Sequence, residues 1–189
     1  MNSRLGLVPV VALMLMAGCA SRHAPPPSAA ARGVADLESH IDRHTDALWQ
    51  SMQRTLPGTW VLATPKSDAE RAFHITYASY SRQSVILETW GAGGARPTIT
   101  TLAPNGGNLV LVHYCAQGNQ PRLRLTSADS REAVFAQFDV TNLQPDQSMM
   151  IRRALTISED GQRVRWIETY RAPSGQTEVT TYELVKSAE

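Results

Sequence analysis

The chain has 189 residues, of which 18 are lysine or arginine and 17 are aspartate or glutamate, so its formal net charge is +1. This balance gives no reason to expect nucleic acid or an anionic membrane surface as a partner, because both favour a strongly basic patch. The length suits one domain with a hydrophobic core and a tail outside it.

The first 18 residues have the pattern of a secretory signal. A positive start at Arg4 precedes an apolar run over 5–16, too short to span a bilayer comfortably. Two small residues then stand directly before Cys19. This ending resembles the lipobox of bacterial lipoproteins, in which the signal is cut before the cysteine and the cysteine carries the lipid. The resemblance implies removal of residues 1–18 and a membrane anchor on Cys19; an ordinary cleaved signal peptide is the alternative.

Residues 19–33 contain three consecutive prolines among alanines and serines, a composition that predicts an extended tether. At position 20 an Asp tends to hold lipoproteins of Gram-negative bacteria in the inner membrane. The chain has Ala20 there, so the resemblance implies an outer-membrane anchor with the domain facing the periplasm. If Cys19 is lipidated, Cys115 is the only thiol, and it is buried and inert, paired between chains, or reactive. The sequence leaves the oligomeric state open.

An amphipathic helix is predicted over 34–56. Its apolar residues recur at spacings of four and seven, which places Leu37, Ile41, Leu48 and Met52 on one stripe. An exposed stripe would favour a scaffold that binds other envelope proteins, whereas burial against the following domain would weaken that interpretation.

Residues 57–189 alternate apolar and polar side chains, and turn residues recur about every ten positions. We expect ten strands, near 59–64, 72–80, 84–91, 97–102, 109–115, 122–127, 133–141, 148–157, 163–171 and 177–185. Ten short strands without a helix between them predict a mainly β fold, an antiparallel up-and-down barrel that leaves no sheet edge. A β-sandwich is the alternative.

Two segments of this region carry a resemblance. Gly58 and Trp60, directly after the predicted helix, look like the G-x-W motif of lipocalins and their calycin relatives. The segment 109–122 and the Glu88-Thr-Trp90 triplet resemble lipocalin-like bacterial proteins of unassigned function. The resemblance implies a lipocalin-like barrel in which Trp60 closes one end and packs against a basic residue from a late strand. The candidates for that residue are Arg163, Arg165 and Arg171.

The strand over 109–115 carries two side chains that could bind a ligand or a metal, His113 and Cys115. Alternation places His113 and Cys115 on the same face, but both faces are apolar, so the sequence does not say which face lines the lumen. In one interpretation the two side chains contact a ligand, a haem or a metal. In the other, His113 is a hydrogen-bonded core or rim residue and Cys115 fills space.

Other candidates lie around a predicted polar mouth near 117–122. Gln120 and Arg122 are candidates for a polar rim that meets a ligand headgroup, with a purely structural corner as the alternative. If the leucines next to Arg122 point inward, the arginine is solvated; if it points inward, it suits a carboxylate or phosphate. Tyr77 and Trp90 are candidates for an apolar wall, with ordinary packing as the alternative.

No arrangement predicts catalysis. Glu88 and Glu168 each flank a tryptophan and form either a carboxylate pair or cross-strand ion pairs. We expect no enzyme, and we assign no metal and no cofactor. The expected function is a lipid-anchored envelope protein whose barrel binds a small apolar or amphipathic ligand. The alternatives are an envelope scaffold without a ligand and a haem- or metal-dependent protein centred on His113.

Overall fold

The structure, a computed structural model, describes residues 44–91 and 97–188. The predicted signal, Cys19, the tether and the first part of the predicted helix lie outside the described residues. Among the described residues, no helix is both long enough and apolar enough to cross a membrane.

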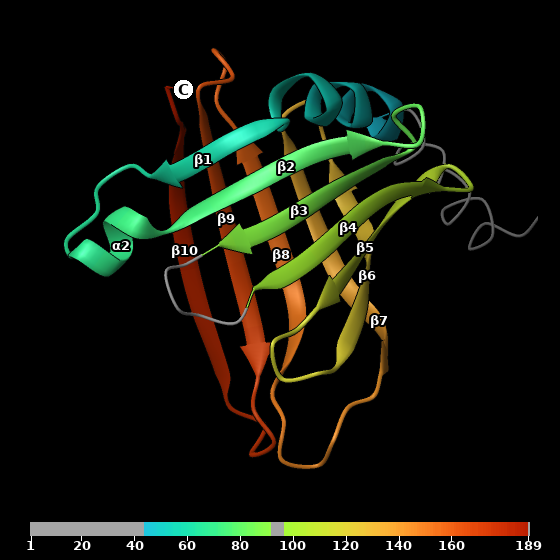
Figure 1. The fold of residues 1–189 in the computed structure, drawn as a ribbon. Coiled ribbons are helices and arrows are strands. Elements are labelled where there is room, and N and C mark those ends of the chain that lie inside the picture. Colours follow the sequence, from blue (N-terminus) through green and yellow to red (C-terminus); the bar gives the residue numbers. More distant parts are fainter. Residues whose placement is uncertain (1–43, 92–96, 189) are drawn as a thin grey trace, which may run out of the picture.

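Ten antiparallel strands form a closed barrel in which each strand pairs with its neighbours in the sequence and β1 pairs with β10 (Figure 1). The strands are β1 (Gly58–Leu62), β2 (His74–Tyr80), β3 (Val85–Gly91), β4 (Thr98–Asn105), β5 (Asn108–Tyr114), β6 (Gln120–Ala128), β7 (Glu132–Thr141), β8 (Met149–Ile157), β9 (Arg163–Arg171) and β10 (Thr177–Lys186). The predicted up-and-down barrel is therefore confirmed, and the sandwich is excluded.

One short element was not expected. Helix α2 (Asp68–Ala72) interrupts the connection between β1 and β2, where the sequence analysis placed no helix. Ser67 begins it by accepting a hydrogen bond from the Glu70 backbone N–H, and Lys66 N–H donates to the Glu70 carboxylate. Five residues are too few to show a helical period, so only the cap marked this turn in the sequence.

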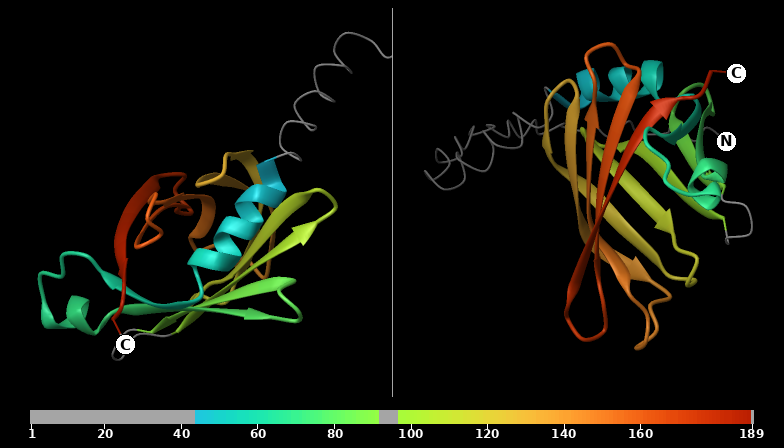
Figure 2. Two further views of the ribbon diagram at one scale, coloured as in Figure 1. Left: turned by 90° about the horizontal axis from the view of Figure 1, so that it is seen from above. Right: turned by 90° about the vertical axis from the view of Figure 1, so that its left-hand side faces the viewer.

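The helix that precedes β1, described over 44–55, lies across one end of the barrel (Figure 2). Leu48 and Met52, on the predicted stripe, and Leu56 just after the helix have no exposed surface and pack into the barrel core. Trp60 donates a hydrogen bond from Nε1 to the Leu56 carbonyl at 2.7 Å, which joins the helix to β1. The described part of the stripe is therefore buried; Leu37 and Ile41 lie outside the described residues.

Trp60 also has its basic partner, but not one of the three arginines proposed from the sequence. The Lys186 ammonium lies 5.6 Å from the Trp60 ring centroid, because β1 and β10 pair with these two residues opposite each other. Arg163, Arg165 and Arg171 are exposed. Gly58 is required nearby: its φ is 122°, and a Cβ would lie 3.1 Å from Lys186 Cε.

Candidate functional site

The barrel interior changes character halfway along its axis. Below the packed core that the helix covers, four neighbouring strands place inward residues side by side. Tyr77 on β2 stands opposite Glu88 on β3, Glu88 opposite Thr100 on β4, and Thr100 opposite His113 on β5. All four are nearly or fully buried. A continuous polar layer therefore crosses one side of the lumen.

Arg153 on β8 reaches this layer from the opposite wall. It forms two parallel hydrogen bonds with Glu88, from Nη1 to Oε1 at 2.9 Å and from Nη2 to Oε2 at 2.7 Å. Its Nε lies 3.0 Å from Oε1 of Glu168, its neighbour on β9, although the angle is not that of a hydrogen bond. The guanidinium stacks 3.8 Å from the Trp166 ring centroid. A buried arginine thus sits between two carboxylates and on an aromatic face.

The pKa values of the two carboxyl groups are shifted in opposite directions. Burial alone would raise the pKa of Glu88, but the charge and hydrogen bonds of Arg153, with Tyr77 and Trp90, hold it below the usual value. Burial raises the pKa of Glu168 to about 7, because the opposing attraction of Arg153 is weaker there and Glu88 repels it. Glu88 is therefore a stable anion, and Glu168 titrates near neutral pH.

His113 is held as a neutral group. Burial and the positive charge of Arg153 lower its pKa to about 4. Both ring nitrogens have partners: Nδ1 lies 3.0 Å from the Thr100 hydroxyl, and Nε2 lies 3.2 Å from the Tyr170 hydroxyl. A ligating histidine needs one nitrogen free, so this geometry favours a hydrogen-bonding role. Among the described residues, no group of three His, Cys, Asp or Glu side chains could hold a metal ion.

A cavity of about 310 Å³ opens beyond the polar layer, at the end of the barrel opposite the helix. We call it the mouth cavity. Its lining combines aromatic rings, the buried polar groups and short side chains from the end loops. The lining residues are Trp90, Thr98, His113, Cys115, Ala116, Gln117, Ser148, Glu168, Tyr170, Glu178, Thr180 and Tyr182.

The loops at this end are tied to each other. Asn119, fully buried, donates from Nδ2 to the Gln147 side chain and to the Ser148 carbonyl, at 3.1 and 3.0 Å. Gln117 donates to the Ser148 hydroxyl at 2.8 Å. These bonds connect the β5–β6 loop to the β7–β8 loop, and they give one side of the mouth a fixed rim.

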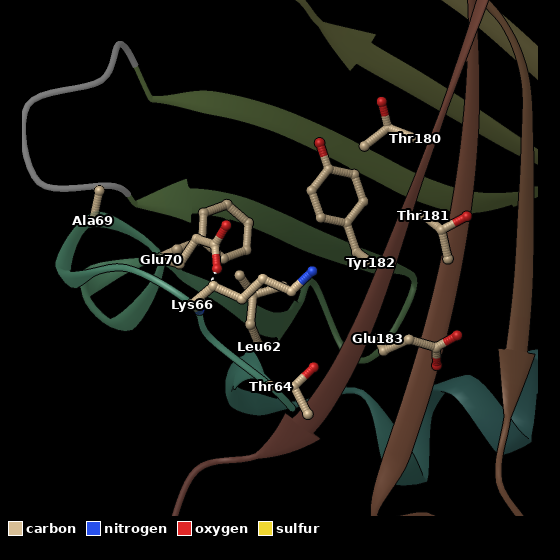
Figure 3. A pocket seen from close by; sticks show the side chains of 10 residues that line it. Leu62, Thr64, Lys66, Ala69, Glu70, Thr180, Thr181, Tyr182 and Glu183 are labelled. Carbon is tan, nitrogen blue, oxygen red and sulfur yellow. Dashed lines mark hydrogen bonds between the residues drawn. The ribbon is translucent and has the colours of Figure 1, made fainter.

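A second hollow, of about 540 Å³, lies next to β10, along the part of that strand that continues past its pairing with the end of β1 (Figure 3). It is lined by the segment around α2, including Lys66 and Phe73, and by four successive residues of β10. Because successive strand residues point to opposite faces, this hollow wraps the edge of β10 rather than filling the lumen. Thr180 and Tyr182 line both hollows.

The structure brings together four of the six residues proposed from the sequence as ligand contacts. His113, Cys115 and Trp90 line the mouth cavity, and Tyr77 lies in the polar layer. Cys115 is a partly buried free thiol. Gln120 lies on the rim, where its amide accepts hydrogen bonds from Thr141 and Asn142.

Arg122 is elsewhere. It points out of the barrel and pairs with Asp139. The leucines that alternate with it, Leu123 and Leu125, fill the lumen instead. Two roles were not predicted from the sequence: Arg153 as the link between Glu88 and Glu168, and Tyr170 as the partner of His113. The signal for Arg153 was the charged residue pair at 152–153, of which one must face inward in a regular strand.

The comparisons with known proteins add no family. No match was found among protein-family models or among curated proteins. The fold and this site are therefore the basis for a functional assignment.

Proposed function

We propose that this chain is a lipid-anchored protein of the bacterial cell envelope whose barrel binds a small amphipathic ligand in the mouth cavity. The observation that carries the proposal is the division of the lumen. One half is filled by the helix side and the apolar core, whereas the other half holds a cavity of about 310 Å³ on the far side of the buried polar layer. A concave site with aromatic walls and a few convergent polar groups is typical of small-molecule binding.

The size and walls of the cavity define what fits. Trp90, Tyr170 and Tyr182 supply apolar surface, while His113 and Glu168 stand at the inner end. A ligand with an apolar body and a polar group directed inward would cover the rings and meet the polar layer. The lumen is therefore suited to a compact amphipathic molecule rather than to a long acyl chain.

The anchoring part of the proposal rests on the sequence before Cys19. Its placement agrees with the barrel, because residue 44, the first described, belongs to the helix over the closed end. The mouth cavity lies at the opposite end. An anchor attached through this helix would leave the mouth facing away from the point of attachment.

The test is native mass spectrometry of the full chain, purified from its own host in mild detergent. We expect a non-covalent small molecule to accompany the wild-type protein. Thr180→Trp, which fills the mouth cavity from β10, should abolish it, and the matched control Val179→Trp, on the exposed face of the same strand, should retain it. A wild-type protein that carries no ligand, or a Thr180→Trp variant that carries the same ligand, would contradict mouth binding.

The anchor has a separate test. The wild-type chain should begin at Cys19, carry added acyl mass and fractionate with membranes, and Cys19→Ser should lose both properties. An unmodified wild-type chain in the soluble fraction would refute the anchor and leave the mouth-binding proposal in place.

A further inference from the structure

The charged side chains that line the mouth cavity are all acidic among the described residues. Its two lining side chains that carry formal charge at neutral pH are acidic: Glu168 on β9 and Glu178 on β10. No lysine or arginine belongs to the lining that the described residues form. His113, which also lines it, stays neutral because its pKa is lowered to about 4. An anionic headgroup would find no cation at the surface of this cavity, whereas a cationic one would find two carboxylates.

Glu168 is also short of hydrogen bonds. Its side chain is 4 % exposed, and its Oε1 is buried without a hydrogen-bond partner among the described residues. The Arg153 Nε, which forms its ion pair, is misaligned for a hydrogen bond, and the Nη groups of that arginine are directed to Glu88. A buried carboxyl normally accepts several hydrogen bonds, and leaving them unmade is costly. Glu168 also lines the mouth cavity, so a donor on a bound molecule can approach its carboxyl group.

The aromatic residues around this carboxyl suit the same kind of group. Trp90 and Tyr182 meet edge to face with ring centroids 4.8 Å apart, and Tyr170 lines the cavity beside Glu168 in the sequence of β9. Aromatic faces attract ammonium and guanidinium groups through the ring quadrupole. The same layer already shows this chemistry on its inner side, where Arg153 lies over Trp166 at 3.8 Å.

We propose that the mouth cavity selects a protonated amine on an apolar body, with the ammonium group donating hydrogen bonds to Glu168 and the apolar part packed against Trp90, Tyr170 and Tyr182. This inference rests on the proposed function, because it requires that the mouth bind a small molecule. It goes further by assigning the charge of the ligand and the residue that recognises it.

The binding should depend on pH through Glu168. Its pKa of about 7 reflects burial first, with attraction by Arg153 and repulsion by Glu88. An ammonium group binds the ionised carboxylate, so the affinity should increase as the pH rises from about 6 to 8. The titratable and charged groups that face this carboxyl or share its cavity are Arg153, Glu88, His113, Cys115, Tyr170, Glu178 and Tyr182. Among the groups whose pKa this environment shifts, Glu168 is the one whose pKa lies near 7.

The test compares three probes of the same shape by calorimetry on the full-length protein: 3-phenylpropylamine, 3-phenylpropanol and 3-phenylpropanoate. At pH 8 we expect the amine to bind at least about tenfold more tightly than the alcohol and the carboxylate, as charge-assisted hydrogen bonds would give. Glu168→Gln should remove about tenfold or more of the amine affinity and leave the alcohol affinity unchanged. The control Glu132→Gln, exposed on β7 near the closed end, should change neither.

The outcomes separate the two proposals. If the alcohol or the carboxylate binds as tightly as the amine, the amine selectivity is wrong and the mouth-binding function stands. If no probe binds and the purified protein carries no ligand, the binding function itself is wrong. Should Glu168→Gln lose its cooperative unfolding transition, the wild-type protein carries the test through its pH dependence. An amine affinity that does not increase between pH 6 and pH 8 would then overturn recognition by Glu168.

Discussion

Replacing Arg153 by methionine tests whether the polar layer forms as described. The arginine and Glu88 both have side chains with no exposed surface, and two hydrogen bonds of 2.9 and 2.7 Å join them. Methionine keeps most of the side-chain volume but removes the charge. Glu88 would then be a buried carboxylate without this counter-ion, and the Glu168 carboxyl would lose its ion pair with the same arginine.

Removing one partner of a buried ion pair costs about 3–5 kcal/mol of unfolding free energy. For a domain of this size, each kcal/mol lowers the melting temperature by about 2–4 °C. We therefore expect Arg153→Met to melt about 6–20 °C below the wild-type protein at pH 8. The matched control is Arg152→Met, because its side chain is exposed on the outer face and its loss should change the melting temperature by only a degree or two.

The stability that Arg153→Met loses relative to the wild type should depend on pH. In the wild-type protein Arg153 holds the pKa of Glu88 low, so this pair stabilises the fold above about pH 4.5 and the stabilisation is lost as the pH falls. Without the arginine, burial raises the Glu88 pKa, so the variant loses stability as the pH rises through that value. The deficit of Arg153→Met should therefore shrink between pH 8 and pH 5.

Urea unfolding followed by far-ultraviolet circular dichroism at both pH values measures this deficit. Adding Glu88→Gln to Arg153→Met should recover part of the lost stability at pH 8, because the uncompensated charge is gone. A single Arg153→Met variant as stable as the wild type at pH 8, with a deficit that does not vary with pH, would refute the buried ion network.

Three further predictions concern single side chains. Raising the Glu168 pKa from 4.5 to about 7 means that its ionisation lowers the unfolding free energy by about 3 kcal/mol at pH 8. Glu168→Gln should therefore unfold at a higher urea concentration than the wild type at pH 8 but not at pH 4.5. Equal urea midpoints at pH 8 would contradict the raised pKa. The His113 ring signal in NMR should titrate near pH 4, and a midpoint near 6.5 would show that the ring is solvated. Met52→Ala should cost about 2–5 kcal/mol in urea unfolding, whereas the same change at a helix residue that does not enter the barrel would cost little.

The ten strands could be predicted because most of them alternate apolar and polar residues and turn residues separate them. Inward residues on β6, such as Leu123 and Leu125, alternate with exposed arginines, and glycine or proline marks most of the turns. The apolar stripe of the helix could also be predicted from its spacing, and its described members are buried. The α2 helix was missed because it has only five residues, although Ser67 and Glu70 have the spacing of a capping box.

The site was less predictable, for reasons of register. The strand over 109–115 is apolar on both faces, so the inward position of His113 follows only from its place opposite Thr100. On β8 a bulge between Met150 and Arg152 shifts the alternation. Strict alternation from the buried Met150 would direct Arg152 inward, but the extra residue directs Arg153 there instead. No local sequence pattern marks that bulge.

The division of the lumen has a physical cause in the number of strands. A barrel of eight strands encloses a space that side chains can fill, and a wider barrel leaves more volume. This barrel has ten strands, and at one end the volume is taken up by Leu48, Met52 and Leu56 from the helix side. At the other end no comparable element enters the lumen among the described residues, and several lining side chains are short, as at Thr98 and Thr180.

The polar layer is what keeps these two halves distinct. If apolar side chains replaced Arg153 and its carboxylates, the core could extend toward the mouth and close over the cavity, often without loss of stability. The guanidinium instead holds polar groups at this level of the lumen, because it forms two hydrogen bonds with Glu88 and stacks 3.8 Å from the Trp166 ring centroid. The charge that this layer buries is unbalanced, since one arginine stands between two carboxylates. The excess carboxyl, Glu168, is also one of the residues that line the mouth cavity, which is where the proposed ligand would meet it.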